Sequence, residues 1–227
     1  MSVRRVGAAV LAVVGPLVAG GLPAPAVAES VPCVNRLVWP DSANGSRMIA
    51  TKLGGGWTSF KAIATSNYSV PQGHNHAFLY GLNTNGRLYR YAPNGAGYKA
   101  YGSFGGFKSF KAMAMISQEA TYDTLLMTTT AGALYTIHIP TNATAKPVVK
   151  VIRKSGWSSF ESLLTEHCGS NYGTVVVGID HNTDSGYQYT FSRAKGTATT
   201  ITPYGKIRIA FPGSVHAART DAWLNGE

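Results

Sequence analysis

The stretch that decides the fold is Gly56-Trp57-Thr58-Ser59-Phe60-Lys61-Ala62-Ile63. It returns, with substitutions, at residues 106–113 and again at residues 156–163, where it begins Gly156-Trp157-Ser158-Ser159-Phe160. The interval is 50 residues both times. A fixed period of this size is typical of a repeat architecture, in which one supersecondary unit is arrayed because it cannot bury its apolar face alone.

Each repeat contains four short segments typical of β-strands, separated by Gly, Asn and Pro residues. In the first repeat these segments are residues 59–65, 77–83, 87–91 and 98–104. In the second they are residues 109–116, 124–129, 133–139 and 148–153, and in the third residues 159–165, 174–179, 187–192 and 198–203. Since no segment shows helical periodicity and Asn85-Gly86 is a favoured hairpin turn, the sequence predicts antiparallel sheet throughout.

The two ends of the chain complement each other. Residues 35–40 and 46–53 resemble the third and fourth strands of a repeat, whereas residues 207–211 and 216–224 would supply the first and second. Ile207 stands one further period beyond the last copy of the opening stretch. An open solenoid would need capped ends, so we expect an all-β fold, a β-propeller of four blades with four antiparallel strands each, whose N- and C-terminal segments close one shared blade. A ring of five blades is the alternative.

The first 28 residues have the pattern of a secretory signal peptide. Arg4-Arg5 form a charged start, residues 6–18 are apolar, and Ala26-Val27-Ala28 is a small-residue cleavage site. The other interpretation, a membrane anchor, is weaker because the uninterrupted apolar run is too short to span a bilayer. We expect a secreted, extracellular protein in which residues 29–227 form a single propeller domain, with no membrane span.

The composition suits an all-β protein with many tight turns. Charged residues are only 13% of the chain, while Gly occurs 26 times and Tyr 12 times. The formal net charge is +10, but Lys and Arg are dispersed and do not form the clustered stripe of a nucleic-acid binder. We therefore expect no specific nucleic-acid partner, although the basic balance leaves open adhesion to an anionic cell-wall or extracellular polymer.

The sequence contains two cysteines, Cys33 and Cys168. Export to an oxidising environment favours a disulfide between them, and both stand in polar, turn-rich surroundings. Two buried free thiols are the alternative. A metal site is not expected at these residues, because there is no Cys-x-x-Cys spacing and His167 is the only neighbouring ligand type.

Two marks recur in each repeat, Gly-aromatic-x-Ser-Phe and, further along, Gly-x-Leu-Tyr. The second mark stands as Gly86-Arg87-Leu88-Tyr89, as Gly132-Ala133-Leu134-Tyr135 and, degraded, as Gly186-Tyr187-Gln188-Tyr189, with Asn35-Arg36-Leu37-Val38 as an N-terminal echo. This pair of marks resembles the repeat of the tachylectin family of β-propeller lectins. The resemblance implies a lectin for N-acetylated hexosamines (GlcNAc or GalNAc) on cell-surface glycans, with a shallow site on each blade or between neighbouring blades.

Sugar recognition needs an aromatic face for the apolar side of the ring, together with amide and hydroxyl groups for its edges. Aromatic residues that recur once in each repeat can instead fill the core between blades, and we favour this core interpretation for Trp57, Phe107 and Trp157. Even a core aromatic residue could present one edge to a sugar. The candidate ligand-binding residues are Trp57, Asn85, Arg87, Tyr89, Tyr135, Trp157 and Tyr189.

One stretch resembles the start of a calcium loop, Asp180-His181-Asn182-Thr183-Asp184-Ser185-Gly186. Such a loop also needs a bidentate acid at its end, where this chain has Phe191, so we favour an enlarged hairpin turn held by Asx hydrogen bonds. His74 and His76 are similarly expected to lie in a solvated loop and not to be a ligand pair. We expect no metal site and no cofactor.

Catalysis is not expected. The ten acidic residues are scattered without a common register, and the sequence contains neither Gly-x-Ser-x-Gly nor His-Glu-x-x-His. A secreted enzyme or inhibitor built on the same fold stays open as an alternative. The sequence thus predicts a monomeric lectin whose partners are glycans.

Overall fold

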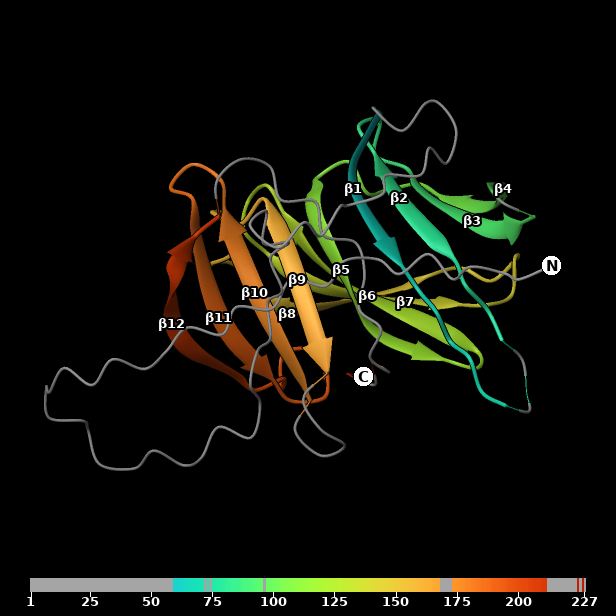
Figure 1. Ribbon diagram of the computed structural model, residues 1–227. Coiled ribbons are helices and arrows are strands. Elements are labelled where there is room, and N and C mark those ends of the chain that lie inside the picture. The colour runs from blue at the N-terminus through green and yellow to red at the C-terminus, as the bar shows by residue number, and fades with distance from the viewer. Residues whose placement is uncertain are drawn as a thin grey trace, which may run out of the picture. The chain divides into compact units, whose positions relative to one another are not determined.

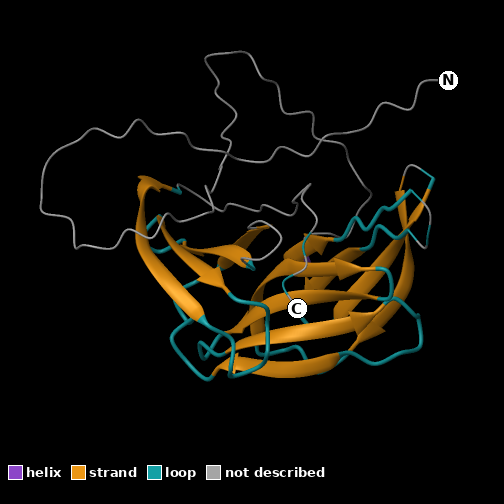
Figure 2. Ribbon diagram, turned by 90° about the horizontal axis from the view of Figure 1, so that it is seen from below, coloured by secondary structure: helices purple, strands orange, loops and turns teal. Residues whose placement is uncertain are grey.

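The computed structural model describes residues 59–71, 73, 75–95, 97–167, 173–211, 224 and 226. All of them belong to one compact unit, Lys52–Glu227. The leader, the N-terminal strands, Trp57, both cysteines and residues 216–223 lie outside the described residues, so the predictions made for them stay predictions. Among the described residues there is no α-helix (Figure 2), and none of them forms a helix long and apolar enough to cross a membrane.

The described chain forms three antiparallel sheets of four strands each (Figure 1). The first sheet consists of β1 (Phe60–Thr65), β2 (Leu79–Asn83), β3 (Leu88–Asn94) and β4 (Gly97–Phe104). The second consists of β5 (Phe110–Glu119), β6 (Tyr122–Thr129), β7 (Leu134–Pro140) and β8 (Val148–Arg153). The third consists of β9 (Ser162–His167), β10 (Thr174–Asp180), β11 (Ser185–Phe191) and β12 (Ile201–Ala210). The predicted all-β, antiparallel class is therefore confirmed.

Strand order within each sheet follows the chain, so each repeat is one meander. The first strands of the three sheets, β1, β5 and β9, lie next to one another with β5 in the middle, and the fourth strands form the outer edges (Figure 1). The 50-residue period therefore corresponds to one complete four-stranded sheet.

The second sheet is buried on both faces because its residues alternate between two cores. Along β5, Met113 and Met115 pack in a cluster with residues of the first sheet. The residues between and beside them, Ala112 and Ala114, pack in a second cluster with residues of the third sheet. Leu126 of β6 also belongs to the second cluster, while its neighbours belong to the first. Each face of the second sheet thus fills a separate interface.

A backbone hydrogen bond explains why an aromatic residue recurs with the repeat. After each sheet, the amide of a buried aromatic residue donates to a carbonyl in the turn between that sheet's second and third strands. The three bonds run from Phe107 N to Gly86 O (3.0 Å), from Trp157 N to Gly132 O (3.0 Å) and from Phe211 N to Asp184 O (2.9 Å). Phe107 and Trp157 therefore each end one sheet and begin the next, and Phe211 ends the third sheet in the same way.

The third of these bonds corrects the predicted start of the fourth repeat. Residues 207–211 were expected to form a separate inner strand, but β12 continues through them to Ala210 and pairs with β11. The prediction is wrong because β12 is a long strand with register shifts opposite β11, which accommodate additional residues. Phe211, and not Ile207, occupies the position that Phe107 and Trp157 occupy earlier in the chain.

The same bond shifts the second mark of the third repeat by two residues. Asp184 takes the place of Gly86 and, like it, has a positive φ, of 49°. Asp tolerates this left-handed conformation better than most residues do. Gly186 then stands where the first two repeats have Leu, and a Cβ there would collide with the Phe211 ring. Tyr187, and not Tyr189, therefore corresponds to Tyr89.

Candidate functional site

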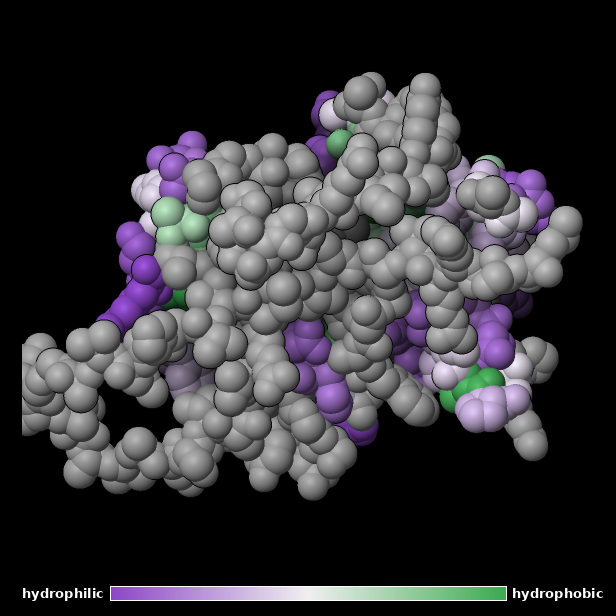
Figure 3. All heavy atoms as spheres, viewed as in Figure 1, coloured by the Kyte–Doolittle hydropathy of each residue, from purple (hydrophilic) through white to green (hydrophobic). Residues whose placement is uncertain are grey.

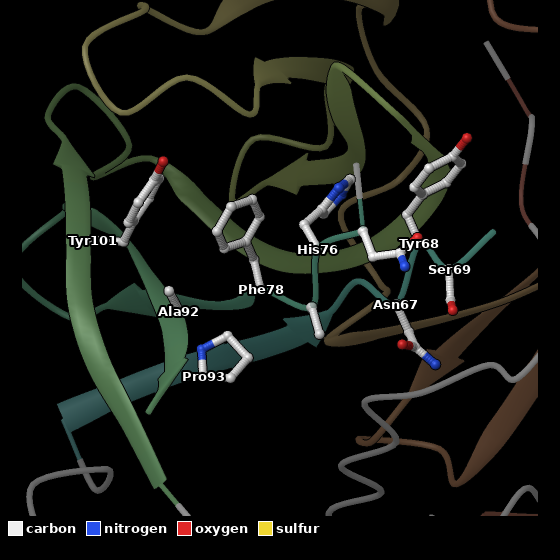
Figure 4. Close-up of a pocket in the computed structure, with 10 residues that line it drawn as sticks. Asn67, Tyr68, Ser69, His76, Phe78, Ala92, Pro93 and Tyr101 are labelled. Carbon is white, nitrogen blue, oxygen red and sulfur yellow. The ribbon is translucent and has the colours of Figure 1, made fainter. Parts of the chain in front are cut away.

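A pocket of about 440 Å³ lies beside the first sheet (Figure 4). The connection between β1 and β2 forms one side of it, and the end of β3 together with β4 forms the other. Its volume is in the range of small-ligand sites. The residues that line it are Asn67, Tyr68, Ser69, Asn75, His76, Ala77, Phe78, Ala92, Pro93 and Tyr101.

Four rings form a continuous row along the pocket (Figure 4). The Tyr101 and Phe78 ring centroids are 5.1 Å apart, those of Phe78 and His76 are 5.1 Å apart, and those of His76 and Tyr68 are 5.6 Å apart. All three pairs are stacked, with interplanar angles from 19° to 30°. Phe78 is only 6% exposed, whereas Tyr101 is 37% exposed. The two middle rings, of Phe78 and His76, are buried, whereas the tyrosine rings at the two ends are partly exposed.

The imidazole of His76 is held from the neighbouring sheet. Its Nε2 donates to Oδ1 of Asp123 on β6 over 2.9 Å, and the Asp123 side chain is completely buried. The other ring nitrogen, Nδ1, is buried and has no hydrogen-bond partner among the described residues. His76 is therefore not the solvated loop residue that was expected from the sequence. No local pattern could have shown this, because Asp123 is 47 residues away.

Tyr80 completes this buried network. Its hydroxyl donates to Oδ2 of Asp123 over 2.7 Å. Burial, followed by the negative charge of Asp123 and the hydrogen bond to it, raises the pKa of Tyr80 well above its ordinary value. Tyr80 thus stays protonated and keeps donating, and both carboxylate oxygens of Asp123 are satisfied.

Arg90 supports the aromatic row from the interior. Its side chain is fully buried, and the guanidinium carbon lies 4.9 Å from the Phe78 ring centroid and 4.8 Å from that of Tyr101. The same guanidinium donates to the carbonyl oxygens of Pro140 (2.6 Å), the last residue of β7, and Asn142 (2.9 Å), which follows β7 in the second sheet. A desolvated cation over aromatic faces is favourable, so Arg90 both fixes the rings and joins two sheets.

The loop that carries the polar side of the pocket is held by hydrogen bonds within the loop and by one to β5. Ser66 N donates to Phe78 O (2.8 Å), and Phe78 N donates back to the Ser66 hydroxyl (3.1 Å). Asn75 accepts from Val70 N through Oδ1 (2.8 Å), and Asn67 N donates to the Gln118 side chain (2.6 Å). The pocket is therefore formed before any ligand arrives, which reduces the entropic cost of binding.

The predicted ligand-binding residues lie elsewhere, and none of those described lines the pocket. Asn85 closes the turn between β2 and β3 by accepting from Arg87 N (3.0 Å). The exposed Arg87 side chain donates to the Ser103 hydroxyl (2.7 Å). Trp57 lies outside the described residues. The turn residues are thus placed away from the aromatic row.

The predicted aromatic candidates lie in the packing between strands. Tyr89 contacts the Phe60 ring edge-on, and Tyr135 contacts the Phe110 ring in the same way. In the third sheet, the ring centroids of Trp157 and Tyr189 are 4.8 Å apart, and Trp157 is 5% exposed. Together with the 4% exposure of Phe107, this confirms the core interpretation for Phe107 and Trp157.

The hairpin interpretation of the calcium-like stretch is also confirmed. Asp180 Oδ1 accepts from the amides of Asn182 (2.9 Å) and Thr183 (3.2 Å), which are Asx-turn bonds. Although burial opposes it, these hydrogen bonds hold the pKa of Asp180 below its ordinary value. In the described part of the chain, no three His, Cys, Asp or Glu side chains are grouped so that they could hold a metal ion.

The pocket residues are missed by repeat analysis because they do not repeat. Phe78 stands three residues before Gly81, which pairs with Tyr89. The equivalent pairs are Met127 with Tyr135 in the second sheet and Gly178 with Tyr187 in the third. Counting back three residues from Met127 and from Gly178 gives Thr124 and Val175. The available signal was the long connection between β1 and β2, which is rich in Asn, His and Tyr and has no counterpart in the tight turn between β5 and β6.

Comparison of the chain with protein-family models, with curated proteins and with solved structures found no match.

Proposed function

We propose that the protein is a secreted lectin with a four-bladed β-propeller fold and that the pocket along Tyr68, His76, Phe78 and Tyr101 binds a neutral carbohydrate. The observation that carries the proposal is the composition of this pocket. It combines aromatic rings with exposed amides and a hydroxyl, and none of the ten described residues that line it is Lys, Arg, Asp or Glu. Aromatic faces suit the C–H side of a sugar, and amides suit its hydroxyl edges.

The propeller part of the proposal is supported by the three meanders and their adjacent first strands. Phe211 makes the same bond that precedes a new sheet at Phe107 and at Trp157, which supports a further unit after the third sheet. Later in the chain, Leu224 and Gly226 lie against the end of β5. Gln118 N donates to Leu224 O (2.9 Å), and Gly226 N donates to Ile116 O (2.8 Å). The N-terminal residues 35–53 would complete this fourth blade. Five blades are the alternative.

The basic residues on the outer strands have a different use. Lys99 on β4, Lys150 on β8 and Lys206 on β12 are exposed, and each of these strands is the edge of its sheet. Hydrophilic side chains gather beside β12 in the space-filling view (Figure 3). Lysine on an edge strand discourages pairing with another chain. The distribution therefore favours protection of edges over a surface for an anionic polymer.

The class of sugar rests on the resemblance of the repeated marks to the tachylectin family, which implies N-acetylated hexosamines. In that family pattern a site would recur on every blade. Since Thr124 and Val175 stand at the positions of Phe78 in the other two sheets, we propose one working site within the described sheets. Affinity would then depend on the quality of this pocket more than on avidity.

The test is a glycan array probed with the chain from Glu29, at low and at high salt, with free N-acetylglucosamine as competitor. The expected result is binding that survives salt and is abolished by the free sugar. Tyr101→Ala should weaken it, whereas Tyr204→Ala, which removes another exposed tyrosine on β12, should not. Binding only to anionic glycans, lost in high salt, would instead indicate a polyanion-binding protein.

A further inference from the structure

The two ends of the aromatic row differ in chemistry. Beside Tyr68 stand the exposed polar side chains of Asn67, Ser69 and Asn75. Beside Tyr101 the described neighbours in the pocket are Ala92 and Pro93, neither of which carries an amide side chain (Figure 4). One end can therefore recognise hydroxyl edges, while the other offers an apolar surface.

The middle of the row separates these two ends. Phe78 and His76 lie between the two tyrosines, stacked on each other and almost fully buried. A single ring of the size of a pyranose can cover one end of the row but does not reach across both intervening rings. Between the ends, the only unpartnered polar atom of the row among the described residues is His76 Nδ1, and this atom is buried.

Tyr101 is fixed although its ring is exposed. Its hydroxyl donates to Thr141 O (3.3 Å), and Arg90 lies over the ring from inside. A rigid, exposed aromatic face at the far end of a pocket is unfavourable to leave in water and loses little entropy on contact. These are the properties of a second binding position.

We propose that the pocket has two subsites and that its ligand is a linear oligosaccharide. This inference rests on the proposed carbohydrate-binding function. One sugar residue takes the polar subsite at Tyr68 and forms the hydrogen bonds that give specificity. A residue further along the same chain stacks on Tyr101 and gives affinity with little selectivity.

The experiment is isothermal titration of the chain from Glu29 with N-acetylglucosamine and with chitin oligosaccharides of increasing length. Affinity is expected to rise by roughly tenfold or more from the monosaccharide to the longer chains, which is the effect of one added favourable contact. Tyr101→Ala should remove this gain, so that the longer chains bind the variant no more tightly than the monosaccharide does. Tyr68→Ala should weaken every member of the series.

Matched controls separate the ring from its hydroxyl and from folding. Tyr101→Phe keeps the ring and should keep the dependence on length, and Tyr204→Ala should behave like the wild type. Equal affinity for the monosaccharide and the longest chain would overturn the two subsites while leaving the proposed function intact. No binding of any member of the series would remove the proposed sugar class and this inference with it.

Discussion

His76 Nε2 donates to Asp123 Oδ1 over 2.9 Å, although the two residues belong to different sheets. The bond places a buried carboxylate behind a pocket whose lining is otherwise uncharged among the described residues. A charge in this position is stable only while its partners are present. The residues that form the pocket and the residues that hold two sheets together are therefore partly the same, and the two roles can be tested separately.

Replacement of Asp123 by Asn should destabilise the protein without changing any residue that lines the pocket. Asp123 accepts from both His76 and Tyr80, and an amide can accept through only one of its two groups. The expected loss in the free energy of unfolding is about 1–3 kcal/mol. Urea titration of the variant should show a lower midpoint with an unchanged slope, and Asp180→Asn, in an exposed turn, is the control. An unchanged midpoint would contradict the buried network.

Tyr80 should give the protein an alkaline limit. Its pKa is raised in the folded state by burial and by Asp123, so the folded protein retains a proton that the unfolded chain releases. Stability is therefore fully present below the pKa of an unfolded tyrosine, about 10, and falls as the pH rises above it. Urea titrations from neutral to alkaline pH should show this fall, and Tyr80→Phe should make it shallower. The same slope in both proteins would contradict the assignment.

Arg90→Lys is not a conservative change at this position. The guanidinium donates from two nitrogens to Pro140 O and Asn142 O, and lysine cannot reproduce this fork. We expect a loss of about 1–3 kcal/mol in stability, measured by urea titration. Ligand affinity should fall as well, because Tyr101 and Phe78 lose the cation behind them. Arg87→Lys, which changes an exposed residue with a bond to Ser103, should change stability by less than about 0.5 kcal/mol.

Gly186→Ala tests whether Phe211 occupies the repeated aromatic position. A Cβ at residue 186 would overlap the Phe211 ring, so the ring or the strand must move. The expected cost is about 1–3 kcal/mol, as for other overpacked cores. Gly97→Ala, where a Cβ meets only Asn94 O at 4.0 Å, is the matched control. Thermal unfolding of the two variants side by side should show a lower midpoint for Gly186→Ala alone.

The strands could be predicted from the sequence because their signals are local. Alternating apolar residues and Asn-Gly or Gly turns repeat with the period, and every predicted strand of the three sheets overlaps an observed one. The start of the fourth repeat was misplaced at Ile207, since the extra length of β12 depends on bulges that leave no mark in composition. Counting by a fixed period fails where one unit is longer than the others.

The site was not predictable in the same way. The geometry of the site depends on contacts between residues far apart in the sequence. Asp123 is 47 residues from His76, and Arg90 is 50 residues from Pro140. The residues that recur with the period include Tyr89, Tyr135 and Trp157, and the fold uses their rings for packing. Among the described residues, Thr124 and Val175 stand where the first sheet has Phe78, so a search for recurring residues does not find this pocket.

The alternation of β5 between two cores has a consequence for how this array could change in evolution. On β5, Met113 and Met115 face the cluster shared with the first sheet, and the smaller Ala112 and Ala114 face the cluster shared with the third. The two sides of the middle unit are therefore not interchangeable. Duplicating, deleting or permuting one repeat would bring together faces built from side chains of different size, so such a change would require both faces of the middle sheet to repack.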